Sequence, residues 1–399
     1  MDLHTGVPLW RSEVLDPLSF STAEGDLSCE VAVIGGGITG ALVSFLLVKA
    51  GVDTLLVDKR TPGEGSTMGS TGLLQYEVDT PLVDLIDKVG VDHAVHAYRR
   101  GLTAINEIEE LVDLVGGSCD FSRRHSLYFA SRPEHLRNLE RECDCRRQYG
   151  FDVRFLSQAA LLDRSTISAP GATWSAGDAQ INPYRFTHRL LKRAQQGGLR
   201  VFSNSAIQSL REDSRGVTLT THNATIFARA AVLATGYEAN EQFAWSPGDL
   251  KSTYAVATEP MKSFDGWPEG GLIWETSRPY FYARQSADGR AIIGGEDTPH
   301  SDDHTNQELL MRKCERLVER FKTLFPQLSI IPSYVWAGTF AETKDGLAYI
   351  GKVPKRSSVY AALGYGGNGI TFSAIAAKLI VDLYVGRPNA DAPVFSFER

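Results

Sequence analysis

The stretch Val31-Ala32-Val33-Ile34-Gly35-Gly36-Gly37-Ile38-Thr39-Gly40 decides the fold of this chain of 399 residues. Four consecutive apolar residues predict a buried strand, and the Gly-x-Gly-x-x-Gly pattern that follows predicts a tight turn into a helix. The helical run continues to Ala50, and Thr54-Leu55-Leu56-Val57 then predicts a second strand that ends at Asp58. Together these elements are typical of a βαβ unit that binds a dinucleotide.

Each glycine of the pattern has its own mechanical reason. Gly35 permits the tight turn, Gly37 lets the backbone approach a pyrophosphate, and Gly40 lets the helix lie close on the strand. The helix N-terminus then presents unpaired N–H groups and a favourable dipole to the phosphates. Asp58 stands where a carboxylate can accept hydrogen bonds from an adenosine ribose. This fingerprint alone does not separate FAD from NAD.

Three later segments bear on the choice of dinucleotide. The loop 59–74 is rich in hydroxyls and backbone donors and suits a second phosphate and a ribityl chain, although an ordinary flexible loop has the same composition. The apolar run 231–236 ends in Ala-Thr-Gly. The glycine run 364–373 leads into an apolar helix, whose N-terminus would stabilise negative charge at a second place, such as the N1–C2=O edge of a reduced flavin.

With these segments in this order, the chain resembles the D-amino-acid-oxidase-like family of FAD-dependent oxidoreductases, which includes glycine oxidase, sarcosine oxidase and γ-glutamylputrescine oxidase. The resemblance covers nearly the whole length. It also rests on Asp288-Gly289-Arg290, Ile293-Gly294-Gly295-Glu296-Asp297, Trp336-Ala337-Gly338 and Thr343-Lys344-Asp345-Gly346-Leu347-Ala348-Tyr349-Ile350-Gly351. It implies FAD as the cofactor. No cysteine stands in the context that carries covalent flavin in the sarcosine oxidases, so we expect non-covalent FAD.

The resemblance also implies the architecture. We expect an α/β chain (α+β overall) with a Rossmann-like FAD-binding domain and an inserted substrate domain built on a mixed or antiparallel sheet. The FAD-binding domain is expected over 1–90, 155–240 and 340–399, and the substrate domain over 91–154 and 241–339. Residues 1–24 are expected to form an irregular leader on the outside.

The candidate cofactor-binding residues follow from the fingerprint and from the other matched segments. They lie in the first βαβ unit, the loop after it, the two segments near 206 and 235, the Trp-Ala-Gly segment and the C-terminal glycine run. They are Gly35, Gly37, Ile38, Thr39, Gly40, Asp58, Lys59, Arg60, Ser66, Thr67, Ser70, Thr71, Gly72, Leu73, Ala206, Ile207, Thr235, Gly236, Gly338, Gly366, Gly367, Asn368, Gly369, Ile370 and Thr371.

The candidate catalytic residues are Tyr280, Tyr282, Arg284 and Lys344. The first three alternate along one predicted strand and therefore point to the same face. If that face borders the flavin, two aromatic walls and a guanidinium suit an amine that carries a carboxylate. The alternative is the buried face of a sheet with an arginine that extends to the surface. Lys344 precedes Asp345-Gly346, where the chain approaches the flavin in the family, and it could equally face solvent.

One position departs from the family pattern. Many members carry an arginine two positions after the Trp-x-Gly segment, where it helps to hold the substrate carboxylate. Here Trp336-Ala337-Gly338-Thr339 is followed by Phe340. The absence of that cation makes simple α-amino acids less suitable substrates and favours amines, N-alkylated compounds or γ-glutamyl polyamine-like compounds.

Composition excludes several other classes of protein. The net charge of −7 disfavours nucleic acid and anionic membranes as partners. The longest apolar stretches are too short or too interrupted to span a bilayer, and the N-terminus lacks the pattern of a secretory signal. The five cysteines are sparse and odd in number, which favours a reducing, cytoplasmic location with free thiols. No metal site is predicted, either at Cys143-x-Cys145 or in the loop 300–304.

These observations favour an FAD-dependent oxidase or dehydrogenase that acts on a CH–NH or CH–NH2 donor. Hydride would pass from carbon to flavin N5, and the imine product would hydrolyse in water. The alternatives are a 2-hydroxyacid-type dehydrogenase, an NAD(P)-dependent dehydrogenase, and a non-catalytic FAD subunit of a larger redox complex. The substrate, the electron acceptor (oxygen or another), a homo-oligomer and a redox partner subunit remain open from the sequence.

Overall fold

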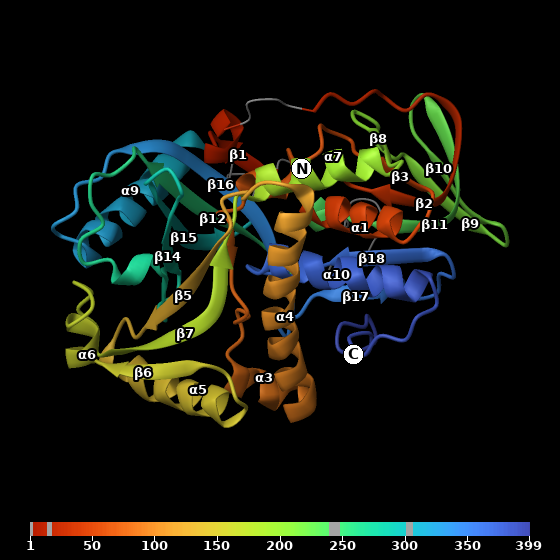
Figure 1. The fold of residues 1–399 in the computed structure, drawn as a ribbon. Coiled ribbons are helices and arrows are strands. Elements are labelled where there is room, and N and C mark those ends of the chain that lie inside the picture. The colour runs from red at the N-terminus through yellow and green to blue at the C-terminus, as the bar shows by residue number, and fades with distance from the viewer. Residues whose placement is uncertain (1–2, 14–17, 239–247, 301–305) are drawn as a thin grey trace.

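The computed structural model describes residues 3–13, 18–238, 248–300 and 306–399. These residues form two β-sheets, one of eight strands and one of ten, with helices packed on and between them (Figure 1). This mixed α/β architecture, with parallel and antiparallel pairing, confirms the predicted fold class.

The eight-stranded sheet contains the predicted βαβ unit. Its order is β17-β18-β11-β2-β3-β8, with β10 paired to β11 and β9 to β10. Strands β18, β11, β2, β3 and β8 run parallel, so their carboxyl ends lie at one edge. The strands are β2 (Gly25–Ile34), β3 (Thr54–Val57), β8 (Arg200–Phe202), β9 (Ser209–Asp213), β10 (Gly216–Thr220), β11 (Ala224–Leu233), β17 (Tyr349–Lys352) and β18 (Val359–Leu363).

The ten-stranded sheet is mostly antiparallel and has the order β1-β16-β12-β15-β14-β13-β5-β7-β4, with β6 paired to β7. Among the described residues of this sheet, the one parallel pair of strands is β13 with β5. The strands are β1 (His4–Gly6), β4 (Leu73–Leu74), β5 (Ser122–Phe129), β6 (Val153–Ser157), β7 (Gly171–Gln180), β12 (Asp249–Thr258), β13 (Leu272–Glu275), β14 (Phe281–Gln285), β15 (Ala291–Pro299) and β16 (Pro332–Glu342).

The helices divide between the two sheets. Helices α1, α7 and α10 pack together beside the smaller sheet, α9 covers the larger sheet, and α4 stands between the two (Figure 1). Helix α1 is almost wholly apolar and buried, as expected for a helix enclosed on all sides. The α-helices are α1 (Ile38–Lys49), α2 (Ser66–Gly69), α3 (Leu82–Val89), α4 (Val91–Val115), α5 (Leu136–Gln148), α6 (Gln158–Leu162), α7 (Pro183–Gln196), α9 (Gln307–Leu324) and α10 (Gly369–Tyr384).

Three strands from segments that we expected in the FAD-binding domain belong instead to the ten-stranded sheet. Strand β7 falls within the predicted FAD-binding segment 155–240, yet it pairs with β4, β5 and β6 in the ten-stranded sheet. Strands β1 and β4 fall within the predicted segment 1–90 and belong to the same larger sheet. The smaller sheet therefore draws its strands from 25–57, 200–233 and 349–363.

The N-terminal segment is more deeply buried than an external leader. Leu9 and Trp10 are 1% and 2% exposed, and the Trp10 indole Nε1 donates a hydrogen bond to the Ser70 carbonyl at 2.6 Å. Strand β1 pairs with β16 at the edge of the larger sheet. The expectation of an outside leader is therefore wrong for residues 3–10, because an edge strand and a buried indole tie them down.

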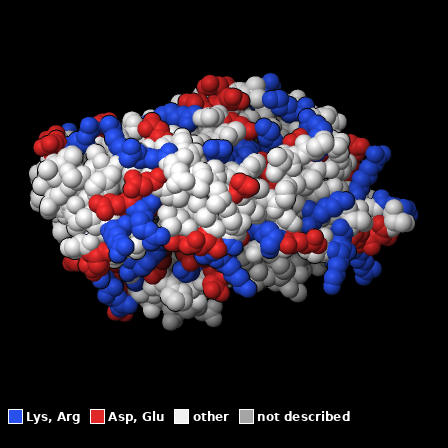
Figure 2. All heavy atoms as spheres, turned by 90° about the horizontal axis from the view of Figure 1, so that it is seen from below, with Lys and Arg blue, Asp and Glu red and all other residues white. Residues whose placement is uncertain are grey.

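The surface carries charges of both signs. On the face seen from below in Figure 2, lysine and arginine side chains alternate with aspartate and glutamate. Among the residues that the structure describes, no helix combines the length and the apolar character needed to cross a membrane.

Candidate active site

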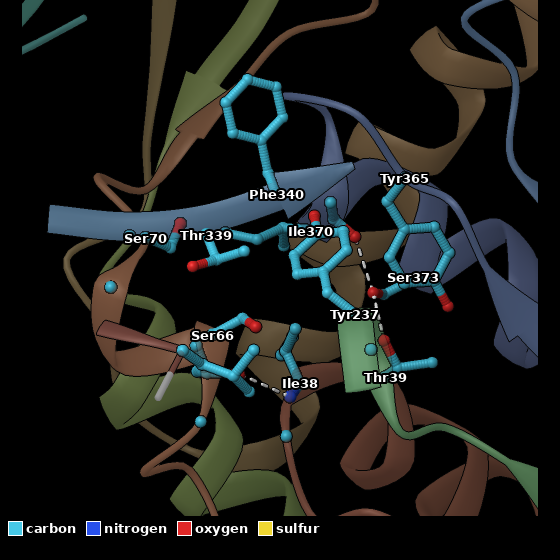
Figure 3. Close-up of a pocket in the computed structure, with 18 of the residues that line it drawn as sticks. Ile38, Thr39, Ser66, Ser70, Tyr237, Thr339, Phe340, Tyr365, Ile370 and Ser373 are labelled. Carbon is cyan, nitrogen blue, oxygen red and sulfur yellow. Dashed lines mark hydrogen bonds between the residues drawn. The ribbon is translucent and has the colours of Figure 1, made fainter. Parts of the chain in front are cut away.

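A large cavity lies where the carboxyl ends of β2, β3 and β11 meet the ten-stranded sheet. The smaller sheet and helices α1 and α10 supply one wall, and β13, β14, β15 and β16 supply the other. Figure 3 shows part of it, with Ile38 and Thr39 of α1 opposite Thr339 of β16 and beside Ser373 of α10. In open α/β sheets, ligands bind at this edge.

The glycines of the fingerprint leave no room for side chains. Gly35 has φ +105°, and a Cβ there would collide with the Ala234 carbonyl. A Cβ on Gly40 would collide with the Gly35 carbonyl, which explains the close contact between α1 and the preceding turn. At Gly37, a Cβ would lie 3.1 Å from Thr67 Oγ1. The turn therefore places bare backbone against the cavity, as a pyrophosphate site requires.

Helix α1 opens with its N-terminus at the cavity. Gly37 is its N-cap and supplies no side-chain cap, so the first N–H groups depend on other partners. The Ile38 N–H donates to Thr67 Oγ1 at 2.9 Å (Figure 3). Thr67 comes from the short helix α2, so the serine- and threonine-rich loop after β3 closes over the helix N-terminus.

Acidic and basic side chains gather at the end of β3. The Asp58 carboxylate accepts hydrogen bonds from the Gly36 N–H at 2.5 Å and from the Arg60 N–H at 2.7 Å, while burial raises its pKa. Lys59 and Arg60 both pair with Glu238, at 2.7 Å and 2.9 Å. Although burial opposes ionisation of Glu238, hydrogen bonds from Arg60 and Lys59 lower its pKa. At this end of the cavity, the basic side chains are therefore paired with Glu238, beside the position predicted for a ribose.

A second helix N-terminus reaches the cavity from the C-terminal part of the chain. The glycine run before α10 wraps around Asp79, whose carboxylate accepts from the Gly367 N–H at 2.8 Å. The Asn368 side chain donates to the carbonyls of Gln75 and Glu77 at 3.2 Å and 2.9 Å. These bonds fix the first turn of α10 against the segment that follows β4, so its dipole is directed at the cavity.

Several buried hydroxyls on the cavity wall lack a partner among the described residues. They are Ser66 Oγ, Thr235 Oγ1 and Thr339 Oγ1, and each belongs to a residue that lines the cavity. Buried polar groups without partners are costly, so their presence indicates a polar ligand. Two helix N-termini, a glycine cradle and these hydroxyls fit an extended dinucleotide such as FAD.

Aromatic and acidic side chains line the far end of the cavity. Tyr282 lies opposite Gly294 in the register of β14 and β15, and a Cβ on Gly294 would collide with the Tyr282 phenol. Burial raises the pKa of Tyr282 to about 12, so its phenol stays neutral. Trp274 stacks on Tyr128 with ring centroids 3.8 Å apart. Burial, with the nearby Asp79 and Glu342 carboxylates, raises the pKa of Asp297 to about 6.

The structure separates the four candidate catalytic residues. Tyr280 and Tyr282 line the cavity, but Arg284 does not. The buried Arg284 guanidinium donates to the backbone carbonyls of Thr71 at 2.6 Å and Ile181 at 3.3 Å. Tyr280 immediately precedes β14, whereas Tyr282 and Arg284 lie on one face of this strand. The segment 71–72 covers the Arg284 guanidinium. Lys344 is exposed and lines an adjoining hollow.

Most candidate cofactor residues line the cavity, and four do not: Gly40, Gly72, Ala206 and Thr371. Gly40 and Gly72 contribute to the site by carrying no side chain. A Cβ on Gly40 would collide with the Gly35 carbonyl, and a Cβ on Gly72, which has φ +74°, would collide with the Ile181 carbonyl. Thr371 Oγ1 donates to the Gln75 carbonyl at 3.3 Å. Ala206 is next to Ile207, which does line the cavity.

Several lining residues were not singled out from the sequence. They are Glu238, Asp79, Asp297, Tyr237, Thr339 and Tyr365. Asp297 and Thr339 stand inside or beside segments already recognised, so their position in those segments was an available signal. Glu238 and Asp79 lie outside such segments, and only the folded chain brings them to the cavity.

Phe340, at the position where the resemblance implies an arginine in many family members, lines the cavity. Its side chain lies on the opposite side of β16 from Thr339 (Figure 3) and packs against the apolar cluster of Leu3, Tyr237 and Ala341. The side chain at this position is therefore apolar and supplies no cation to the cavity.

The site and the fold define a dinucleotide-binding protein in which the ten-stranded sheet covers one end of the cavity. A family model described as "FAD dependent oxidoreductase" matches residues 30–383, and the chain belongs to this family. Its cofactor is FAD. All five cysteines are described and free, and none lines the cavity, in agreement with non-covalent binding.

Curated relatives match over most of their length. The glycine oxidase of Geobacillus kaustophilus is 27% identical over 388 residues, covering 93% of this chain and 97% of that protein. The γ-glutamylputrescine oxidoreductase of Escherichia coli is 25% identical over 385 residues, covering 92% and 86%.

Solved structures show the same fold. The crystal structure of glycine oxidase from Geobacillus kaustophilus matches with a TM-score of 0.77 at 24% identity, covering 94% of this chain and 99% of that one. The L-proline dehydrogenase from P. horikoshii matches with a TM-score of 0.77 at 19% identity, covering 91% and 95%.

Proposed function

We propose that this chain oxidises a C–N bond of an amine or amino-acid-like substrate. The reacting group would lie at the end of the cavity lined by Tyr280, Tyr282, Trp274, Asp79 and Asp297. The relatives support this proposal, because their names describe a glycine oxidase and a γ-glutamylputrescine oxidoreductase.

The observation that carries the proposal is the charge at this end of the cavity. Asp79 and Asp297 line it, and the two described cations of the cavity, Lys59 and Arg60, are paired with Glu238 at the other end. Carboxylates and aromatic faces attract an ammonium group. A 2-hydroxyacid would instead bring its carboxylate beside Asp79 and Asp297, so the same charges disfavour the alternative dehydrogenase.

The chain's own residues would bind the amine and manage its proton. FAD, when bound, supplies the acceptor for the two electrons that leave the substrate carbon as hydride. The amine must be neutral before hydride can leave, and Asp297, with its pKa raised to about 6, is suited to accept the ammonium proton near neutral pH. The neutral Tyr282 phenol would donate a hydrogen bond that orients the substrate. The resulting imine then reacts with water to give a carbonyl compound and the released amine or ammonia.

The proposal is tested by the visible spectrum of the purified holoprotein under anaerobic conditions. Amines, N-methyl amino acids, amino acids and hydroxy acids are added in turn, and the yellow colour of the flavin is followed. Bleaching by a nitrogen compound supports the proposal, and rapid return of the colour in air would identify oxygen as an acceptor. Bleaching by hydroxy acids alone would contradict it. A yellow protein that none of these compounds bleaches would instead support the non-catalytic FAD subunit.

A further inference from the structure

We propose that the substrate carries a carboxylate several bonds away from the C–N bond that is oxidised, and that Arg278 binds this carboxylate. This inference rests on the proposed function and names the substrate class of the same site. The class is the ω-amino acids and their N-alkyl derivatives, in which a carbon chain separates the amine from the acid.

The first step is the absence of a cation where an α-carboxylate would lie. Phe340 packs against an apolar cluster, and Arg284 is committed to the Thr71 and Ile181 carbonyls. Among the described residues that line the cavity, the reactive end holds carboxylates and aromatic rings but no lysine or arginine. A carboxylate attached to the reacting carbon would therefore meet Asp297 rather than a cation.

The second step is the hollow that adjoins this end. It shares Asp79, Tyr280, Asp297 and Gly366 with the main cavity, so a ligand could extend from one into the other past the Tyr280 ring. The remaining wall of the hollow carries four cations, Lys88, Lys251, Arg278 and Lys344, and one further carboxylate, Glu342. Lysine and arginine side chains, which are absent from the reactive end, thus enter the lining beyond Tyr280.

Arg278 is the cation best placed to bind an anion. Lys251 already pairs with Glu342 at 2.5 Å, and Lys88 donates to the Lys344 carbonyl at 3.1 Å. Within the described part of the chain, Arg278 has neither an ion pair nor a hydrogen bond, and its guanidinium carbon lies 3.0 Å from the centroid of the Tyr280 ring. Stacking on a tyrosine holds the guanidinium plane but leaves its N–H groups available for a bidentate carboxylate.

The resulting arrangement selects a particular molecule. An amine held between Tyr282 and Asp297 places its attached chain along Tyr280, and a carboxylate at the far end reaches Arg278. A diamine would bring a second positive charge beside the Arg278 guanidinium, and a monoamine would leave Arg278 without a partner. The structure therefore favours ω-amino acids over diamines and monoamines of equal length.

The test compares matched substrates with the wild-type holoenzyme. Straight-chain ω-amino acids of increasing length, and the diamines and monoamines of the same chain length, are assayed by anaerobic flavin bleaching and by kcat and KM. We expect one length of ω-amino acid to exceed its matched diamine and monoamine by at least about 10-fold in kcat/KM, the range for one charge-assisted bidentate contact.

A variant then assigns the effect to Arg278. Arg278→Met should raise KM for the preferred ω-amino acid by at least about 10-fold with little change in kcat, because a remote contact contributes similarly to ground state and transition state. Arg278→Lys should restore part of the loss. The monoamine should react equally well with wild type and Arg278→Met.

A matched control is available nearby. Arg132 is exposed and lines neither hollow, and its neighbour Ser131 bonds the Ser277 N–H at 3.0 Å, one residue before Arg278. Arg132→Met should leave KM for all substrates unchanged.

The outcomes separate this inference from the proposed function. Preference for diamines or monoamines, or an equal loss for all substrates in Arg278→Met, would overturn the role of Arg278 while leaving amine oxidation in place. Failure of every amine to bleach the flavin would overturn both.

Discussion

Thr39 Oγ1 and Ser373 Oγ lie 2.8 Å apart, although 334 residues separate them in the chain. Ser373 also donates to the Gly369 carbonyl at 2.6 Å, so its proton is committed and Thr39 is the donor in the pair. The bond joins the first turn of α1 to the start of the second turn of α10, the two helices whose N-termini face the cavity (Figure 3). The two positive helix ends are thereby held in one fixed arrangement.

This pair should couple cofactor binding to the packing of the two helices. We expect Thr39→Val and Ser373→Ala each to weaken FAD binding and to lower the free energy of unfolding, with a coupling energy of about 1 kcal/mol in a double-mutant cycle. Urea unfolding of the apoprotein and FAD titration measure the two effects. Thr39→Ser keeps the hydroxyl and is the control. Strictly additive single effects would show that the bond couples nothing.

Gly40→Ala should abolish FAD binding. The new Cβ would collide with the Gly35 carbonyl, so α1 must move away from the turn that holds the pyrophosphate. The flavin absorbance of the purified protein, relative to that of the polypeptide, reports the loss.

A second glycine at the other end of the same helix serves as the control. Gly51 has φ +81° and open space around its Cβ position, so Gly51→Ala should cost about 1 kcal/mol of backbone strain but retain FAD. Normal FAD content in Gly40→Ala would contradict the steric account.

Asp297→Asn should stabilise the apoprotein at neutral pH. The folded pKa of about 6 lies above the value of about 3.9 for an unfolded aspartate, so the folded state binds more protons in between. The loss of folding stability that comes from ionising the buried Asp297 carboxyl is absent below about pH 4 and complete above about pH 6. Asparagine cannot ionise and therefore removes this loss. We expect a gain of on the order of 1–2 kcal/mol in urea unfolding at neutral pH, which shrinks toward pH 4.

Asp288 provides a comparison of opposite sign on the same hairpin. Burial alone would raise the pKa of Asp288, but hydrogen bonds from Ser286 and Arg290 lower this pKa below its usual value. Asp288→Asn should therefore destabilise the protein at neutral pH. If Asp297→Asn also destabilises it, the Asp297 carboxylate has a cation partner in the apoprotein and the argument fails.

Arg284→Met should act on stability more than on chemistry. The guanidinium is 2% exposed and satisfies buried backbone carbonyls of the segments that cover it. Its removal leaves those acceptors without donors, and we expect a loss of about 3 kcal/mol in the free energy of unfolding. Thermal unfolding of the apoprotein measures this loss. An unchanged melting temperature with a lost affinity for the substrate would instead return Arg284 to the binding site.

Local patterns predicted the parts of the site that depend on short stretches of chain. The Gly35–Gly40 turn and the glycine run before α10 each combine a helix N-terminus with a close backbone approach, and both features are visible in neighbouring residues. The alternation of Tyr280, Tyr282 and Arg284 likewise predicted one shared face.

What the sequence did not reveal depends on distant contacts. The face that carries Tyr282 is open to the cavity, but the segment 71–72, more than 200 residues earlier, covers Arg284 one step along. Glu238 reaches Lys59 and Arg60 only after β3 and β11 join one sheet. The burial of Trp10 and the pairing of β7 with β5 are also tertiary facts, and no periodicity in those segments encodes them.

The interleaving of the smaller sheet imposes an order on biosynthesis. Strand β2 and helix α1 are translated before β11, which pairs with β2, and before α10, which packs on α1. A nascent chain therefore carries a glycine turn and an apolar helix without the neighbours that cover them, and such exposed surface invites chaperone binding. The complete flavin site therefore forms only after α10 has been translated and has packed on α1.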